Sequence, residues 1–285
     1  MHRLRGVKEC LYPASAEEAA RMLSEKGDSA RIVGGGLHLS AFPNPQVSTL
    51  IFLTKAGLTY IRTDEQRVRI GALATITEFA ENREAQSVLR GSVSRTCKCI
   101  ASQLLRNQIT FGGSVAQREP YSDVASILLA LRAKVLLNDG FNDFEIEIEE
   151  FYKKDFRSIL KKAVIKEVNF ENFGSEFHFA MERFTRNATD ISHLNVATLL
   201  KLEELRISDA SIFVGSRPSS PYRFAELEEF LKGKELGDQT AKEAQEFARE
   251  KVEVEKDIRI SKEYRKELVG VYVKRILLKT LSEVV

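Results

Sequence analysis

Two clusters of glycine are the residues of this sequence with the clearest potential for chemistry. The stretch "RIVGGGLHL" places Gly34, Gly35 and Gly36 after a short apolar run, and "TFGGSV" contains Gly112 and Gly113. A glycine-rich turn exposes successive main-chain N–H groups with no Cβ in the way, and such groups form an anion-binding concavity. The two turns therefore predict a site for two phosphates, although each cluster is also typical of a plain tight turn.

The familiar phosphate-binding motifs do not fit these turns. A Rossmann fingerprint needs a third glycine where Leu39 stands and a helix that runs on from the turn. Pro43 and Pro45 follow so closely that we expect no helix there. A P-loop needs a Lys-Ser or Lys-Thr pair, which neither turn has. A dinucleotide held by these turns would therefore require another fold.

The three cysteines do not predict a metal site or a disulfide framework. Cys10, Cys97 and Cys99 are too few for a four-thiolate cluster, and the four histidines are scattered along the chain. We therefore expect no iron–sulfur cluster and no other metal in this chain. His38 stands beside the first glycine turn, but we assign no acid–base role to it.

Composition narrows the possible partners. The 43 Lys and Arg residues are balanced by 41 Asp and Glu residues, so no excess of positive charge is available for nucleic acid. No run approaches the roughly 18 apolar residues that span a bilayer, and the N-terminal segment lacks the apolar core of a signal peptide. We expect a cytoplasmic protein that binds neither nucleic acid nor membrane.

The first half of the chain is predicted to mix helices and strands. Ser15 with Glu18 and Thr75 with Glu78 have the spacing of capping boxes, and Gly27 is a suitable end for the first helix. Further helices are predicted over 87–108 and 124–131, and strands over 30–33, 48–53, 135–137, 144–152 and 163–172, with two more within 58–72.

The second half of the chain has strands first and helices last, which is typical of an α+β domain. Strands are predicted over 176–184, 194–202 and 205–215, and helices over 223–231, 240–253 and 263–281. In the last helix a shared buried face is predicted for Tyr264, Leu268, Val271, Tyr272 and Leu278. The change of pattern near 172–175 predicts two domains, over 1–173 and 174–285.

Three stretches resemble a known family. These are "RIGALATITEF", "IASQLLRNQITFGGSVAQREPYSDVASILLALRAKVLL" and "DIRISKEYRKELVGVYVKRILL". They are similar to the FAD-binding medium subunit of the molybdenum hydroxylases, of the xanthine dehydrogenase and carbon monoxide dehydrogenase type. The resemblance is most specific over 100–123, where Arg106-Asn107, 110–113 and Ser122-Asp123 repeat family elements in order and spacing. It implies an α+β fold, with a two-subdomain FAD domain of the vanillyl-alcohol-oxidase (PCMH) type followed by a C-terminal α+β domain.

The resemblance also implies which residues lie at FAD. The two turns would offer main-chain N–H groups to the pyrophosphate, and Asp123 would accept hydrogen bonds from ribityl or ribose hydroxyls unless it serves only as a helix cap. The implied residues are Val33, Gly34, Gly35, Gly36, Leu37, His38, Leu39, Ile100, Thr110, Phe111, Gly112, Gly113, Ser114 and Asp123.

Four positions depart from the family pattern. Gly36 and Leu37 stand where the family has a polar pair, so only main-chain contacts remain available there. Ser114 replaces the family's asparagine, and Arg183 replaces its lysine. We expect Arg183 and Asp190 to form a salt-bridged strand end rather than to contact the flavin.

The resemblance implies an oxidoreductase subunit that carries out electron transfer. It would take electrons from the iron–sulfur clusters of a small partner subunit and pass them from FAD to NAD or another acceptor, beside a large molybdopterin subunit. Two alternatives stay open. One is a standalone FAD-dependent reductase or oxidase, and the other is a flavin-free scaffold subunit.

Overall fold

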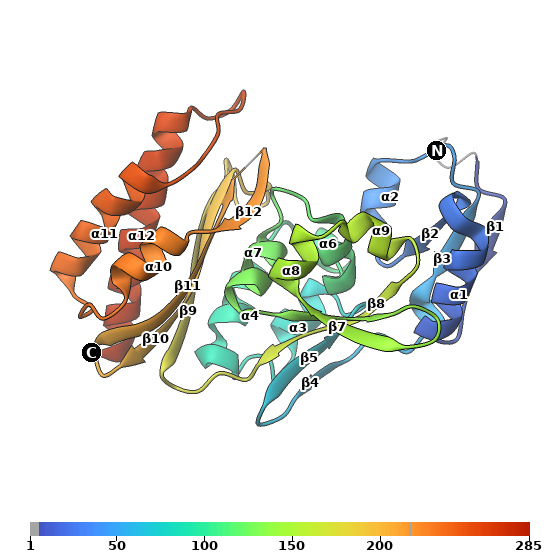
Figure 1. Cartoon of the computed structure of the whole chain (residues 1–285), viewed down its shortest axis with the longest axis horizontal. Coiled ribbons are helices and arrows are strands. Elements are labelled where there is room, and N and C mark those ends of the chain that lie inside the picture. The colour runs from blue at the N-terminus through green and yellow to red at the C-terminus, as the bar shows by residue number, and fades with distance from the viewer. Residues whose placement is uncertain (1–5, 217) are drawn as a thin grey trace. The chain divides into compact units, whose positions relative to one another are not determined.

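The computed structural model describes residues 6–216 and 218–285, which divide into two compact units (Figure 1). Unit 1 contains 6–85, Gln103–Gln117 and Ala133–Asn172. Unit 2 contains Gln86–Ser102, Arg118–Arg132 and Phe173–Val285, apart from residue 217. The predicted mixture of helix and sheet is confirmed, whereas the domain boundary at residue 173 stays a prediction.

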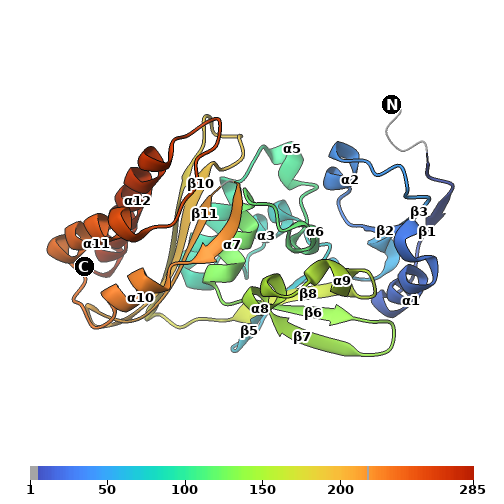
Figure 2. The same ribbon diagram turned by 45° about the horizontal axis from the view of Figure 1, so that its top comes forward.

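Unit 1 contains two sheets. A parallel three-stranded sheet has the order β1-β3-β2, and an antiparallel five-stranded sheet has the order β4-β5-β8-β6-β7 (Figure 2). The strands are β1 (Glu9–Leu11), β2 (Ala30–Val33), β3 (Thr49–Phe52), β4 (Ile61–Thr63), β5 (Arg67–Gly71), β6 (Lys134–Asn138), β7 (Asp143–Glu147) and β8 (Val164–Glu171). The helices are α1 (Ala16–Lys26), α2 (Leu37–Ala41), α3 (Ile76–Glu81), α5 (Gln103–Arg106), α6 (Phe111–Gln117), α8 (Ile148–Lys153) and α9 (Phe156–Leu160), with 3₁₀ turns at Gly27–Ser29 and Leu53–Lys55.

Unit 2 is built on one antiparallel sheet with the order β12-β11-β10-β9. Its strands are β9 (Phe177–Phe184), β10 (Leu194–Glu203), β11 (Arg206–Ser216) and β12 (Ser219–Arg223). Its helices are α4 (Ser92–Lys98), α7 (Asp123–Ala130), α10 (Ala225–Leu231), α11 (Asp238–Lys251) and α12 (Lys262–Val284), with a 3₁₀ turn at Val88–Gly91. Helices α10, α11 and α12 gather along the sheet in Figure 1, and their apolar side chains share one core with alternate residues of β10.

The capping signals place two helices of unit 1 as predicted. The Ser15 hydroxyl accepts a hydrogen bond from the Glu18 N–H at the start of α1, and Gly27 ends this helix. At α3 both halves of the capping box form, because the Glu78 carboxylate also accepts from the Thr75 N–H at 2.7 Å. The capping box at Thr75 is confirmed in full, whereas at Ser15 only the hydroxyl half forms, because Glu18 accepts from the Ala14 N–H instead.

Several predicted elements are wrong in detail, and β1, α6 and α9 were not predicted. A short helix, α2, forms before the two prolines, where we expected none. The helix predicted over 87–108 is broken into a 3₁₀ turn, α4 and α5, because Leu89, Arg90 and Ala101 adopt positive φ angles. The second half of the strand predicted over 144–152 is helix α8, and β12 was not predicted.

The buried face predicted for the last helix is correct only in part. Tyr272 is buried, and Leu268, Val271 and Leu278 pack partly buried against the core. Tyr264 is 49% exposed, and its ring lies edge-on to Phe184. None of the helices within the described residues is both long and apolar enough to cross a membrane.

A polar network joins α1 to the five-stranded sheet of unit 1. The Lys166 ammonium lies 3.0 Å from Glu17 Oε1 and 2.8 Å from Asp143 Oδ2, and the Asn138 amide donates to both carboxylates. Hydrogen bonds from its own main-chain N–H and from Lys166 lower the pKa of Glu17 to about 2. Glu17 therefore contributes its ion pair to this network only while it is ionised.

We expect Glu17→Gln to lower stability at neutral pH and to have no effect in strong acid. The folded pKa is below the unfolded one, so the contribution of Glu17 is complete above about pH 4.5 and is lost as the pH falls towards 2. The side chain is 38% exposed, so solvent screening limits the effect to roughly 0.5–1 kcal/mol. Urea unfolding of the variant and the wild type between pH 2.5 and 6 measures it, with Glu25→Gln on the exposed side of α1 as control. A gap as large at pH 2.5 as at pH 6 would contradict this account.

Candidate functional site

The first glycine cluster lies in unit 1 against the segment that precedes the second. An added Cβ at Gly35 would overlap the main-chain oxygen of Gln108, and one at Gly34 would lie 3.0 Å from Thr110 Oγ1. Gly36 has a φ of +76°, in the left-handed region that favours glycine, and it turns the chain from β2 into α2. The turn after β2 therefore contacts the segment before α6 most closely at Gly35, where there is no room for a side chain.

The first turn has main-chain donors to offer. Within residues 6–216 and 218–285, no acceptor meets the N–H groups of Gly35, Gly36 or Leu37. Three successive N–H groups without Cβ shielding at the glycines suit an anion. The His38 ring lies 5.0 Å from the Phe42 ring, and the Leu39 side chain packs partly buried beside Val33.

The second cluster is the first turn of helix α6, not a loop, and its donors are occupied. The N–H groups of Phe111 and Gly112 bond to the carbonyls of Ala74 and Ala72. Those of Gly113 and Ser114 bond to Thr110, at its hydroxyl and its carbonyl oxygen. These main-chain donors are therefore already paired within the protein, and the residues that contact the first turn are Gln108 and Thr110, just before the helix.

The remaining two predicted site residues lie in unit 2. Ile100 is buried just after α4, and Asp123 is the first residue of α7 with only 4% of its surface exposed. The N-cap of α7 is Ser122, whose hydroxyl accepts from the Ala125 N–H. Of the two roles left open for Asp123 in this helix, the structure therefore gives it the first-turn position and not the cap.

Asp123 is held by polar groups from two strands. Its Oδ2 lies 3.1 Å from Arg183 Nη2 on β9, and its Oδ1 accepts a hydrogen bond of 2.9 Å from Asn195 Nδ2 on β10. Burial raises the pKa of Asp123, while the charge of Arg183 and the hydrogen bonds from Ser192 and Asn195 oppose that rise. The carboxylate thus depends on its partners to stay charged inside the protein.

The ion pair of Arg183 differs from the one expected. Arg183 pairs with Asp123, and it meets Asp190 only at the main-chain oxygen, at 3.0 Å. The Asp190 carboxylate instead accepts from Arg186 Nε at 2.7 Å. Sequence reasoning also missed Asn195, although an asparagine within the apolar strand "LNVATLLKL" was an available signal.

Comparison with known families decides the identity of the chain. The family described as "FAD binding domain in molybdopterin dehydrogenase" matches residues 5–170, and "CO dehydrogenase flavoprotein C-terminal domain" matches residues 179–280. The chain belongs to this flavoprotein family. Its cofactor is FAD, and its relatives are dehydrogenase and oxidase proteins, so the chain is an oxidoreductase component.

Individual relatives of this flavoprotein family cover nearly the whole chain. The chain is 29% identical to the 6-hydroxypseudooxynicotine dehydrogenase complex subunit alpha of Paenarthrobacter nicotinovorans, over 94% of this chain and 92% of that protein. It is 25% identical to the glyceraldehyde dehydrogenase medium chain of Sulfolobus acidocaldarius, over 90% and 92%. The structure of carbon monoxide dehydrogenase from Hydrogenophaga pseudoflava matches with a TM-score of 0.88 at 23% identity, over 97% and 98% of the two chains, which shows the shared fold.

The glycine turn fits the cofactor of this flavoprotein family. The FAD pyrophosphate is an anion, and the turn after β2 presents unpaired N–H groups where side chains are excluded. The departures at Gly36 and Leu37 remove polar side chains and leave these main-chain donors in place. The turn therefore keeps its main-chain N–H donors in spite of these departures.

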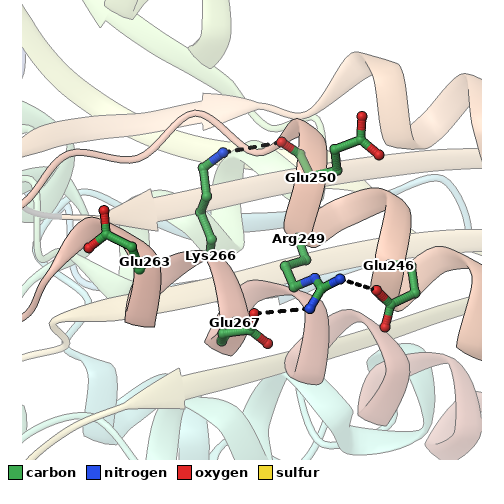
Figure 3. Close-up of a pocket in the computed structure, with 6 residues that line it drawn as sticks. All are labelled: Glu246, Arg249, Glu250, Glu263, Lys266 and Glu267. Atoms are coloured by element: carbon green, nitrogen blue, oxygen red, sulfur yellow. Dashed lines mark hydrogen bonds and ion pairs between the residues drawn. The ribbon is translucent and has the colours of Figure 1, made fainter.

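A charged hollow on the C-terminal helices is separate from these residues. It has a volume of about 320 Å³ and lies along α11 and α12, with Glu246, Arg249, Glu250, Glu263, Lys266 and Glu267 at its edge (Figure 3). Arg249 pairs with Glu246 at 2.5 Å and with Glu267 at 3.2 Å, and Lys266 donates to the Glu250 carbonyl. Both cations are thus paired with oxygens around the hollow, and none of the predicted site residues lines it.

Proposed function

We propose that this chain is the flavoprotein subunit of a molybdenum hydroxylase complex. The observation that supports this most is the contact between the glycine turn and the segment before α6, which leaves the N–H groups of Gly35, Gly36 and Leu37 unpaired. These groups would hold the FAD pyrophosphate, and Asp123 would accept from a cofactor hydroxyl. When bound, FAD supplies the electron transfer, from the iron–sulfur clusters of a partner to NAD or another acceptor.

The partners proposed for this chain are a small iron–sulfur subunit and a large molybdopterin subunit. Relatives carry names such as complex subunit alpha and medium chain, which supports a multi-subunit assembly. The three cysteines, of which Cys97 is buried, suit a chain whose clusters belong to a partner. A cytoplasmic location stays a prediction.

Flavin uptake tests the cofactor site. We expect the purified chain, after incubation with FAD and gel filtration, to carry an equimolar amount of flavin with an oxidised-flavin absorption spectrum. A colourless protein that takes up no FAD would contradict the proposal and favour the flavin-free scaffold.

Partner capture tests the subunit role. We expect an affinity-tagged chain, expressed from its native host, to co-purify with an iron–sulfur protein and a larger molybdenum protein. The isolated chain should lack turnover of organic substrates. Full turnover with NADH and an electron acceptor in the absence of partners would instead support the standalone reductase.

A further inference from the structure

The buried amide of Asn195 lies against one oxygen of Asp123. Asn195 is fully buried on β10, between apolar neighbours of the strand, where an amide lacking a partner would destabilise the fold. Its Nδ2 donates to Asp123 Oδ1 at 2.9 Å, so the amide is oriented by this carboxylate. Its partner in the β10–β11 register is Gly215, where an added Cβ would lie 2.5 Å from Asn195 Oδ1. Glycine at position 215 thus leaves room for the Asn195 side chain.

The guanidinium of Arg183 lies against the other oxygen of Asp123. Nη2 of Arg183 is 3.1 Å from Asp123 Oδ2, and its Nε donates to the Ser192 hydroxyl at 3.1 Å. The same guanidinium also donates to the main-chain oxygens of Asp190 and Cys99. The planar guanidinium of Arg183 therefore connects Asp123, at the start of α7, to Cys99, which precedes Ile100.

The partners of Asp123 determine the ionisation and the orientation of its carboxylate. An ionised carboxylate inside a protein is costly unless it is paired and hydrogen-bonded. The charged group that faces Asp123 is Arg183, and the neutral donors are Asn195 and Ser192. Because Arg183 lies at one oxygen and Asn195 donates to the other, with Ser192 as a further donor, the remaining lone pairs of Asp123 point in set directions.

We propose that Asn195 and Arg183 are positioning residues that hold the Asp123 carboxylate ready to accept a hydrogen bond from a hydroxyl of FAD. This inference rests on the proposed function, because it takes Asp123 as a cofactor contact. In this inference both positioning residues act through their contacts with Asp123. Asn195 acts only through Asp123, which makes its effect on FAD separable from its effect on folding.

The test compares Asn195→Ala with Asn195→Asp by titrating the full chain with FAD and following flavin fluorescence. Asn195→Ala removes a hydrogen bond to a charged group, and we expect FAD affinity to fall about tenfold at pH 8. Asn195→Asp places a second carboxylate beside Asp123, and we expect a loss of at least about tenfold at pH 8.

Measuring FAD affinity at lower pH distinguishes a positioning role of Asn195 from a purely structural one. When the carboxyl at position 195 gains a proton, it donates as the amide did, so the affinity of Asn195→Asp should recover to within about threefold of wild type by pH 5.5. Asn195→Ala has no group that can regain the bond, so its affinity should stay low. The affinity of the wild type should stay level or decline on acidification, because burial raises the pKa of Asp123.

Thr198→Val is the matched control. Thr198 is a buried polar residue of the same strand, and its hydroxyl donates to the Ala180 carbonyl, away from Asp123. We expect a similar loss of thermal stability with less than about a twofold change in FAD affinity. Should Asn195→Ala fail to fold, Ser192→Ala removes a different donor to Asp123 and should weaken FAD binding about threefold.

The outcomes distinguish this inference from the function on which it rests. A wild-type chain that binds no FAD overturns both. A wild-type chain that binds FAD, together with folded Asn195 variants of unchanged affinity, overturns only the positioning role. Weak binding by Asn195→Asp that does not change between pH 8 and 5.5 also overturns it, because a purely structural defect has no reason to reverse with protonation.

Discussion

Replacing Gly35 with alanine should abolish FAD retention and lower the free energy of unfolding of unit 1 by about 3 kcal/mol or more. The added methyl group would overlap the Gln108 main-chain oxygen, and main chain cannot rotate away as a side chain can. The turn must then move off the segment before α6, which displaces the N–H groups of Gly36 and Leu37. Urea unfolding and the FAD absorbance left after gel filtration measure the two effects.

Two other glycine-to-alanine substitutions serve as controls for this prediction. At Gly34 the added Cβ would lie 3.0 Å from Thr110 Oγ1, a side-chain atom that can shift, so Gly34→Ala should be milder. At Gly237 the space is open and the backbone is extended, so Gly237→Ala should change neither property. If Gly35→Ala retained FAD with wild-type affinity, the close contact between the two segments would not be what supports the site.

Local signals in the sequence predicted the elements that depend on local hydrogen bonds. The ends of α1 and α3 follow from side chains three residues apart, and the structure contains these bonds. Most strands of both units follow from short runs rich in apolar and β-branched residues. Such elements are predictable because the interactions that fix their bounds lie within a few residues.

Elements that depend on distant contacts were mispredicted. Helix α6 begins with Phe111 and two glycines, a poor helical sequence. It forms because the carbonyls of Ala72 and Ala74 accept its first N–H groups and Thr110 caps it. No pattern within 110–117 contains that information, since its partners lie about forty residues earlier.

The candidate site was predictable to a similar extent. The glycines identified the first turn, because bare backbone is visible in a sequence. The sequence could not predict whether the N–H groups of each turn are free to bind a ligand. That depends on whether Ala72, Ala74 or Thr110 already accepts their hydrogen bonds. Asn195 escaped notice because its role depends on a helix 72 residues away in the chain.

Phe111→Ala should destabilise unit 1 by about 3–5 kcal/mol, the range for a large aromatic side chain deleted from a core. Phe111 is 1% exposed, and its ring lies edge-on to Phe79 with the centroids 5.3 Å apart. The resemblance placed Phe111 at the cofactor, but the ring is enclosed in the protein interior. Urea unfolding at neutral pH measures the loss.

Phe111→Leu then separates packing from cofactor contact. Leucine refills much of the volume, so we expect a smaller loss of stability, on the order of 1–2 kcal/mol. The FAD affinity of the folded variant should stay within about threefold of wild type, because position 111 supports the site through its main chain and its buried ring. A stable Phe111→Leu that no longer retained FAD would instead mean that the ring contacts the flavin. In that case the start of α6 would belong to the FAD-binding surface itself, in addition to supporting the glycine turn.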